Sequence, residues 1–527
     1  MCDAKDNAIS RQKVGASAQQ FTIFAANGAA QSLKRAKIAG KFSAKSASSL
    51  RAYSCSNMVF SSITFLFVFL PIVLLGHTLL RSTRGRNVFL LLMSLLFYAW
   101  GEGPIALVML AAICVNHFAA LWIARAPDPM RRKRRMTFTI AFDLSLLVVF
   151  KYANFIVDNL NVALAACSLK PLYIPAVHLP IGISFFLFQG ISYILDVYRH
   201  TTTAQTKWVR SALYISLFPQ LIAGPIVRYT DVAEDMQERT VRRDAFAEGV
   251  QRFIIGLAKK VLLADTLGYI ADQLFGAPVS ALGASAAWLG VLCYAFQIYF
   301  DFSAYSDMAI GLGKMLGFHF PENFNYPYIA ASVREFWRRW HISLSTWFRD
   351  YLYIPLGGSR GSARRTYFNL LIVFFLCGLW HGASWNFAAW GLLHGLFLAL
   401  ERAGLGRLLK QLPIALQHVY TLLVVLLGWV LFRAEDGAHA WQYLQAMAGG
   451  NASPSYYAAF YFDAEIIGTL VLAALFSMPV YPAVEAWLAQ RGALAEAAKL
   501  LLLLCGFALS IILLINSSYH PFIYFRF

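Results

Sequence analysis

Residues Thr366–Leu400 decide the fold class, and they read TYFNLLIVFFLCGLWHGASWNFAAWGLLHGLFLAL. The stretch contains no Asp, Glu, Lys or Arg over its 35 residues. A helix needs about 20 apolar residues to cross the hydrocarbon core of a bilayer. The stretch is therefore long enough for a tight helical hairpin, or for one span followed by a buried turn.

The whole chain shares this apolar character. Of its 527 residues, 59% are hydrophobic and 14% are charged, against roughly 25% charged residues in soluble domains, and the mean hydropathy is +0.56. These proportions exclude a soluble enzyme, a disordered protein and a disulfide-stapled secreted module. We predict an all-α, polytopic transmembrane helical bundle of roughly ten to thirteen spans, since apolar runs follow one another with short breaks.

The net charge of +18 suggests an anionic partner or a role in topology. Most basic residues lie in short loops such as Arg131–Arg135, where they orient a membrane protein with these loops in the cytoplasm. No nucleic-acid-binding module is present, so we expect the lipid bilayer and not nucleic acid as partner. Ser211–Val227 is short and interrupted by prolines and a glycine, which predicts a re-entrant segment buried in protein.

Residues 1–57 differ from the rest of the chain. They carry nine Lys or Arg and two Asp or Glu, which contributes +7 and leaves +11 for residues 58–527. The composition predicts a disordered basic leader, and Met58 directly precedes an apolar run that could begin the natural protein. Residues 58–527 then form a single transmembrane domain.

Two histidines stand out in this apolar background. His381 lies midway along the uncharged stretch, and a neutral imidazole can take a proton from a hydroxyl. His341 lies within Arg334–Tyr351, where aromatic residues recur at helical spacing and predict one amphipathic helix along the membrane surface. For either histidine, packing in the core is the simpler interpretation; the functional one places both imidazoles in the same cavity.

Two carboxylates, Asp301 and Asp307, lie in the apolar run Ile298–Gly311. They could bind a metal, pair with arginines or line a polar tunnel. Their six-residue spacing places them about 120° apart around a helix, which favours ion pairs, and we predict no metal site. The seven cysteines show no CxxC spacing and predict no disulfide or metal ligand.

Four motifs together resemble the membrane-bound O-acyltransferase (MBOAT) family, in its branch that serves bacterial alginate O-acetylation. The motifs are PQLIAGPIVR (Pro219–Arg228), YFDFSAYSDMAIG (Tyr299–Gly311), FWRRWHISLSTWFRDYLYIPLGG (Phe336–Gly358) and GLWHGASWNF (Gly378–Phe387). The resemblance extends from Met58 to the C-terminal FIYFRF.

The resemblance implies a helical bundle around a tunnel and an acyltransferase activity. Acetyl groups would pass from a cytoplasmic thioester, acetyl-CoA, to a hydroxyl on the periplasmic side of the bacterial inner membrane, without a bound cofactor. His381 corresponds to the family's catalytic histidine and His341 to an upstream polar position. The expected tunnel residues are Trp380, Trp385, Asn386 and Asp307, with Arg338 and Arg339 at the cytoplasmic mouth.

The final acceptor stays open at this point. An exopolysaccharide such as alginate is expected, reached through separate periplasmic acetyltransferase proteins, because the chain has no polar segment large enough to bind a long polymer. Cellulose or another cell-surface polymer is an alternative. A transporter that passes acyl groups or lipid-linked sugars without catalysis is a second class, although no internal repeat typical of transporters is visible.

Overall fold

The structure is a computed structural model that describes residues 58–488, 490–517, 519 and 521–523. The predicted leader lies outside the described residues. The chain divides into two units at Asn57 and Met58, and everything below concerns the second. Within the described residues the regular elements are helices, and the only extended pairing is an isolated bridge between Leu282 and Tyr456.

The α-helices are, in chain order, α3 (Leu70–Leu79), α4 (Thr83–Glu102), α5 (Ala106–Ala124), α6 (Pro129–Leu147), α7 (Ala153–Ala166), α8 (Ile183–Tyr198), α9 (Trp208–Ser216), α10 (Phe218–Leu221), α11 (Tyr229–Val232), α12 (Arg243–Ala258), α13 (Thr266–Phe275), α14 (Ala284–Leu316), α15 (Val333–Arg339), α16 (Ile342–Phe348), α17 (Ala363–His381), α18 (Trp385–Leu400), α19 (Gly406–Leu409), α20 (Ile414–Arg433), α21 (Gly437–Met447), α22 (Ala464–Phe476), α23 (Val480–Leu488) and α24 (Ala493–Asn516). Wider π-helical turns are η1 (Phe65–Phe69), η3 (Val148–Tyr152), η4 (Lys259–Asp265), η7 (Arg349–Tyr353) and η8 (Glu401–Leu405), and short 3-10 turns are η2 (Gly103–Ile105), η5 (Val279–Ala281), η6 (Pro327–Ile329) and η9 (Ala458–Phe460).

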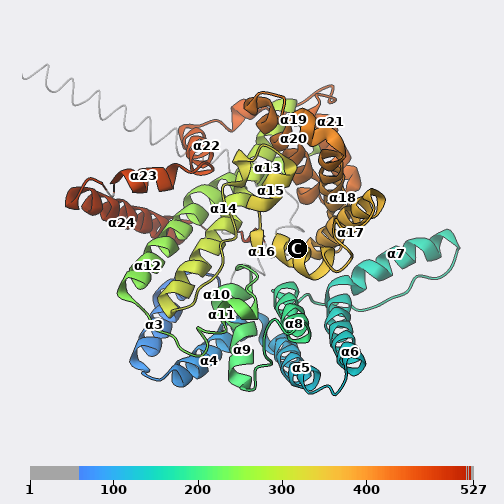
Figure 1. The fold of residues 1–527 in the computed structure, drawn as a ribbon. Coiled ribbons are helices and arrows are strands. Elements are labelled where there is room, and N and C mark those ends of the chain that lie inside the picture. Colours follow the sequence, from blue (N-terminus) through green and yellow to red (C-terminus); the bar gives the residue numbers. More distant parts are fainter. Residues whose placement is uncertain (1–57, 489, 518, 520, 524–527) are drawn as a thin grey trace, which may run out of the picture. The chain divides into compact units, whose positions relative to one another are not determined.

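The uncharged stretch folds as the helical hairpin, the first of the two predicted alternatives. Helices α17 and α18 pack along each other (Figure 1), with glycines where their backbones meet. A Cβ atom on Gly378 would lie 2.1 Å from the carbonyl oxygen of Phe387, and one on Gly391 would lie 2.1 Å from that of Phe374. Only glycine permits this approach, so the two glycines bring the end of α17 against the start of α18.

Helix α14 is the long buried element of the bundle. It runs for 33 residues, lies beside α12 (Figure 1) and also packs against α13, α20 and α21. Gly249 of α12 faces Gly311 of α14, where a Cβ on either glycine would lie 2.6 Å from the other's carbonyl oxygen. This close contact fixes α14 in the core, with the middle of the helix, at Ile298 and Phe302, beside the candidate site.

The predicted re-entrant segment is broken and buried, as expected. Helix α9 ends at Ser216, the short α10 follows, and the chain from Ile222 to Arg228 has no regular structure. Every residue from Ser211 to Val227 is buried. Irregular backbone is tolerated at membrane depth only inside protein, and this segment meets that condition.

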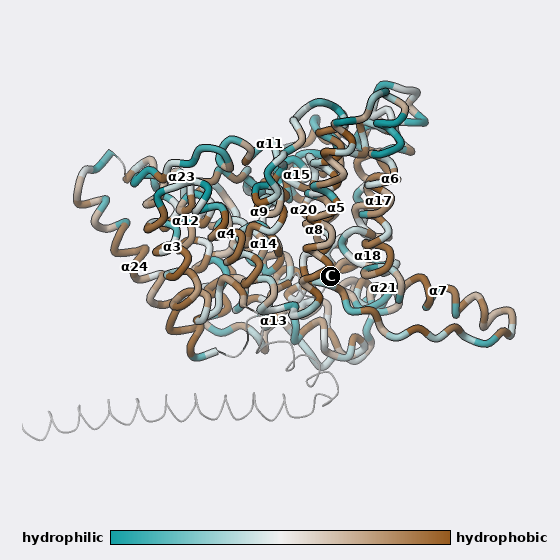
Figure 2. Tube along the Cα trace, turned by 90° about the horizontal axis from the view of Figure 1, so that it is seen from below, coloured by the Kyte–Doolittle hydropathy of each residue, from teal (hydrophilic) through white to brown (hydrophobic). Residues whose placement is uncertain are grey.

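Fewer helices qualify as membrane spans than the predicted ten to thirteen. By length and apolar composition four helical stretches qualify among the described residues, and the bent pair α22 and α23 would make a fifth. The four are Thr83–Ala124, Pro129–Ala166, Ile414–Arg433 and Ala493–Asn516. The other predicted spans are short, broken by π-helical turns or interrupted by charge, as in α17 with Arg364 and Arg365. In Figure 2 apolar stretches recur through the bundle, and α7 extends away from the other helices.

Candidate active site

His381 is the last residue of α17 and is 6% exposed. Aromatic rings enclose its imidazole. The ring centroids lie 4.9 Å from Trp380, 5.1 Å from Trp390 and 5.2 Å from Phe432. The hairpin contact at Gly378 and Gly391 holds α18 beside the end of α17, and so places Trp390 over the imidazole.

The single amphipathic helix predicted over Arg334–Tyr351 is wrong, because the chain breaks in its middle. Helix α15 ends at Arg339, Trp340 is extended, and α16 begins after His341, which has φ 43° and ψ 55°. This left-handed conformation is uncommon outside glycine, and helical periodicity carries no sign of it. The predicted aromatic face is nevertheless buried throughout, and His341 itself is 0% exposed.

The break brings His341 close to His381, although only His381 lines the cavity in which the functional interpretation placed both imidazoles. The two imidazole centroids lie 6.5 Å apart. Trp380 lies beside both, with its ring centroid 6.1 Å from that of His341 and 4.9 Å from that of His381. Trp380, which was expected to line the tunnel, is 3% exposed and packs between the histidines, but it is not among the residues that line the cavity described below.

Asn323 fixes the tautomer of His341. The backbone amide of Ser343 donates to Asn323 Oδ1 at 3.2 Å, and the Ser343 hydroxyl donates to the same atom at 2.8 Å. A backbone amide cannot accept, so this atom is the carbonyl oxygen of Asn323. His341 Nδ1, 3.1 Å from the same oxygen, must then carry the hydrogen. Nε2 of the neutral imidazole is left as a lone pair, which can accept a proton.

Several polar ring atoms around the histidines lack partners. Within the residues that the structure describes, no hydrogen-bond partner reaches Nε2 of His341, Nε2 of His381, or the indole nitrogens of Trp380 and Trp390. His394 on α18 is 0% exposed and both of its ring nitrogens are also without a partner there. Buried polar atoms are normally satisfied, so this cluster is suited to a polar ligand or water.

A narrow cavity lies next to His381. Its lining is almost entirely aromatic or aliphatic and comprises Ile298, Phe302, Trp340, His381, Trp390, Trp429, Phe432 and Ile523. Ile523 belongs to the C-terminal segment, and its backbone amide donates to Asp301 Oδ2 at 2.8 Å. Asp301 in turn pairs with Lys260 at 2.8 Å. A buried ion pair thus anchors the chain end beside the cavity.

Of the other predicted tunnel residues, none lines this cavity. Trp385 is 62% exposed and donates from its indole to Asn159 at 2.8 Å. Asn386 is buried, but its side chain donates to the carbonyl of Ala434 at 3.0 Å. Both residues lie in the first turn of α18, whereas Trp390, further along the same helix, does line the cavity. Periodicity alone cannot tell which part of α18 reaches the cavity.

Asp307 is held in ion pairs, which was the interpretation that its spacing favoured. Arg252 lies 2.9 Å and Lys259 2.7 Å from its carboxylate oxygens. The prediction that it lines the tunnel next to the histidines finds no support in the cavity lining. Among the described residues no group of three or more His, Cys, Asp or Glu side chains could hold a metal ion.

The predicted arginines at the mouth behave differently from each other. Arg338 is exposed, whereas Arg339 is tied to Glu335 at 2.8 Å and to the carbonyl of Asn325 at 3.1 Å. Arg339 is therefore occupied by structural contacts, and of the two only Arg338 extends freely at the surface.

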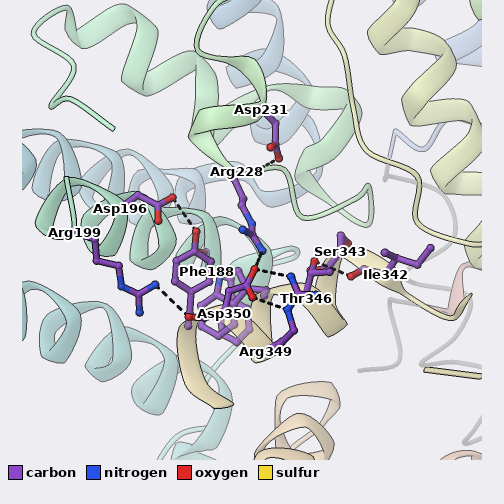
Figure 3. Close-up of polar contacts among 12 residues, drawn as sticks. Phe188, Asp196, Arg199, Arg228, Asp231, Ile342, Ser343, Thr346, Arg349 and Asp350 are labelled. Carbon is purple, nitrogen blue, oxygen red and sulfur yellow. Dashed lines mark hydrogen bonds and ion pairs between the residues drawn. The ribbon is translucent and has the colours of Figure 1, made fainter. Parts of the chain in front are cut away.

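A different arginine cluster stands at the far end of α16 from His341 (Figure 3). Arg228 and Arg349 reach the Asp350 carboxylate at 2.7 and 2.6 Å, and Arg199 donates to its backbone carbonyl at 3.2 Å. Burial alone would raise the pKa of Asp350, but hydrogen bonds from Arg349 and Arg228 hold it below its ordinary value. The ionised Asp350 clamps the end of the element that begins at His341.

Sequence reasoning missed three groups at this site. Asn323, Lys151 and His394 all approach the histidines or their neighbouring rings. Asn323 gives no local signal, since it is an ordinary polar residue that meets His341 only through the fold. Lys151 does give one, because it is a lone cation in a long apolar run.

Comparison with known proteins shows that the chain belongs to a known family. The model of the MBOAT, membrane-bound O-acyltransferase family, matches residues 208–432, which include both histidines. The chain is therefore a multi-pass membrane acyltransferase.

Similar proteins extend the comparison over most of the chain. A probable alginate O-acetylase of Pseudomonas aeruginosa is 48% identical over 391 residues, which are 74% of this chain and 75% of the relative. A peptidoglycan O-acetyltransferase of Helicobacter pylori is 36% identical over 430 residues, 75% of this chain and 80% of the relative. A teichoic acid D-alanyltransferase of Bacillus subtilis is 29% identical over 235 residues, 41% of this chain and 58% of the relative.

Proposed function

We propose that this chain transfers acetyl groups from acetyl-CoA, presented at the cytoplasmic face, to the periplasmic side of the bacterial inner membrane for O-acetylation of an exopolysaccharide, alginate. The observation that carries the proposal is the buried pair His341 and His381, with ring centroids 6.5 Å apart and both Nε2 atoms unpartnered among the described residues. The alginate O-acetylase relative at 48% identity supports the choice of polymer.

In the proposed reaction His381 is the general base. It takes the proton from the acceptor hydroxyl as that oxygen attacks the carbonyl carbon of the thioester. The C–S bond then breaks, the sulfur leaves with the proton that His381 carries, and the products are an ester and a free thiol. General base catalysis of this kind contributes about 10²- to 10⁴-fold in rate.

The resting tautomer of His341 bears on its role. While neutral, its Nε2 has a lone pair and cannot donate to an oxyanion, because Asn323 holds the hydrogen on Nδ1. His341 is therefore better suited to accept a hydrogen bond from the acceptor hydroxyl and to orient it. The amide oxygen of Asn323 would hold the His341 imidazole in the tautomer and orientation that this role requires.

The surroundings of the reaction belong to the same proposal. Basic groups at the cytoplasmic mouth, including Arg338, would attract the anionic donor. Periplasmic acetyltransferase proteins would receive the acetyl group and pass it to the polymer. Acetylation of cellulose or another cell-surface polymer, and transport without bond formation, are the outcomes against which the proposal is tested.

The test uses an alginate-producing strain that lacks its own membrane O-acetylase and expresses this chain. Wild type should restore the acetyl content of secreted alginate, and His381→Ala should abolish it at unchanged membrane level. His381→Gln, close in shape but without a basic nitrogen, should be equally inactive. Normal acetyl content in His381→Ala would refute the role of His381 as general base. Unacetylated alginate together with acetylated peptidoglycan or cellulose would show that alginate is not the polymer that this chain serves.

A further inference from the structure

Lys151 is an unusual residue for its place in the chain. It is the only Lys or Arg between Arg135 and Lys170, and it lies within the apolar stretch Pro129–Ala166. A cation at membrane depth is costly unless it is compensated. In the part of the chain that the structure describes, Lys151 forms no ion pair with a carboxylate, so its compensation must come from elsewhere.

The partners of Lys151 are the backbone at the end of α17. Its Nζ donates to the carbonyl of Trp380, to that of His381 at 3.3 Å, and to the hydroxyl of Ser184 at 3.3 Å. The next residue, Tyr152, donates from its hydroxyl to the carbonyl of Leu379 at 2.8 Å. Two adjacent side chains therefore hold three successive carbonyls, those of Leu379, Trp380 and His381.

The π-helical turn η3 explains how both side chains reach this target. A π-helical turn widens the helix and changes the direction of the side chains that it carries, and such turns occur often at functional sites. Here the turn joins α6 to α7. It presents Lys151 and Tyr152 together to the end of the neighbouring helix α17.

The contact suits the chemistry of a helix end. The last carbonyls of a helix have no partner within it, and they carry the negative end of the helix dipole, which favours a nearby cation. The ammonium also lies 5.8 Å from the centre of the Trp380 ring. Lys151 thus holds both the backbone and the ring of the residue that lies between the two histidines.

We propose that Lys151 is a positioning residue for His381. By binding the carbonyls of Trp380 and His381, it sets the orientation of the imidazole that serves as base. The inference rests on the proposed function of His381. A displacement of about 1 Å in a catalytic group can cost about 100-fold in rate, so loss of this anchor should act on turnover.

The experiment compares variants in inverted membrane vesicles supplied with acetyl-CoA, with transfer of the labelled acetyl group as readout. Lys151→Met keeps the length of the side chain and removes its charge and donors, whereas Lys151→Arg keeps both. Lys170→Met, at an exposed position of the following loop, is the matched control. The turnover number, the KM for acetyl-CoA and the thermal stability of the purified protein are measured for each.

We expect Lys151→Met to lower turnover about 100-fold with KM and thermal stability unchanged, and Lys151→Arg to recover part of the loss. If Lys151→Met does not accumulate in the membrane, Lys151→Gln, which removes the charge but keeps a hydrogen-bonding amide group, is measured in its place for turnover, KM and thermal stability. Wild-type turnover in the neutral variant overturns the inference, as does a loss of stability in which the remaining folded molecules turn over normally. His381→Ala measured in parallel separates the two proposals, because its activity would overturn the proposed function itself.

Discussion

Asn323 offers the sharpest test of the geometry around His341. It is 1% exposed, and its carbonyl oxygen accepts from three donors, namely His341 Nδ1, the Ser343 amide and the Ser343 hydroxyl, at 3.1, 3.2 and 2.8 Å. Asn323→Ala removes the acceptor from all three. We expect the variant to lose both the fixed tautomer and the orientation of the His341 imidazole.

The size of the effect follows from the contacts. Each buried donor left without an acceptor costs about 1–3 kcal/mol, and three of them cost about 3–9 kcal/mol before water enters the space. The part that acts on catalysis is the loss of the tautomer. Removing the group that orients a catalytic histidine lowers turnover by about 10²-fold or more, which corresponds to at least about 2.7 kcal/mol of transition-state stabilisation.

The assay is acetyl transfer in vesicles, normalised to the amount of folded protein in the membrane. Asn323→Asp is the comparison variant, because it keeps an acceptor oxygen for His341 and Ser343 in the same place, although it replaces the donor to Ser306 at 3.0 Å by a second oxygen and adds a carboxylate. It should keep turnover within about tenfold of wild type, since the tautomer is preserved. If Asn323→Ala turns over like wild type while His341→Ala is inactive, the reasoning on the tautomer is refuted.

Two further predictions concern stability. Gly391→Ala places a methyl group 2.1 Å from the backbone oxygen of Phe374, so the hairpin must open, at a cost of about 1–3 kcal/mol or more in stability. The melting temperature of this variant should fall well below that of Gly468→Ala, where nothing lies within 4 Å of the added methyl group. Equal melting temperatures would contradict the close packing of α17 and α18. Lys260→Met removes the ammonium that lies 2.6 Å from the Asp265 carboxylate and 2.8 Å from that of Asp301, at a cost of about 3–5 kcal/mol in stability. Immunoblots of membranes should therefore show little of this variant. A normal amount would show that the ion pair does not hold the chain end.

The membrane class and the all-helical fold could be predicted because each depends on local composition, and the α17–α18 hairpin was one of the two alternatives that the uncharged run left open. An uncharged run of 35 residues can form only a hairpin or one span with a buried turn, and His381 stands out midway along it as an ionisable side chain. The ion pairs of Asp307 followed from its spacing. These features need no knowledge of which helices meet.

The remainder depends on contacts between distant parts of the chain. The aromatic residues before and after the break at His341 are all buried, so their helical spacing in the sequence is not interrupted there. A continuous helix was expected for that reason. Trp390 of α18 lines the cavity, whereas Trp385 and Asn386 at the start of the same helix do not, and no spacing in the sequence encodes that difference. Fewer helices qualify as spans by length and apolar composition than the predicted ten to thirteen, because the fold breaks or bends apolar runs that look continuous in the sequence.

The central claim is that acetyl transfer across the membrane depends on His381. Its most direct test supplies acetyl-CoA with a labelled acetyl group to inverted inner-membrane vesicles from the alginate-producing strain. The account predicts that wild type releases one free thiol for each label bound covalently in the lumen, and that His381→Ala does neither at equal membrane level. Label that accumulates in the lumen without thiol release, or equal transfer by His381→Ala, would contradict it.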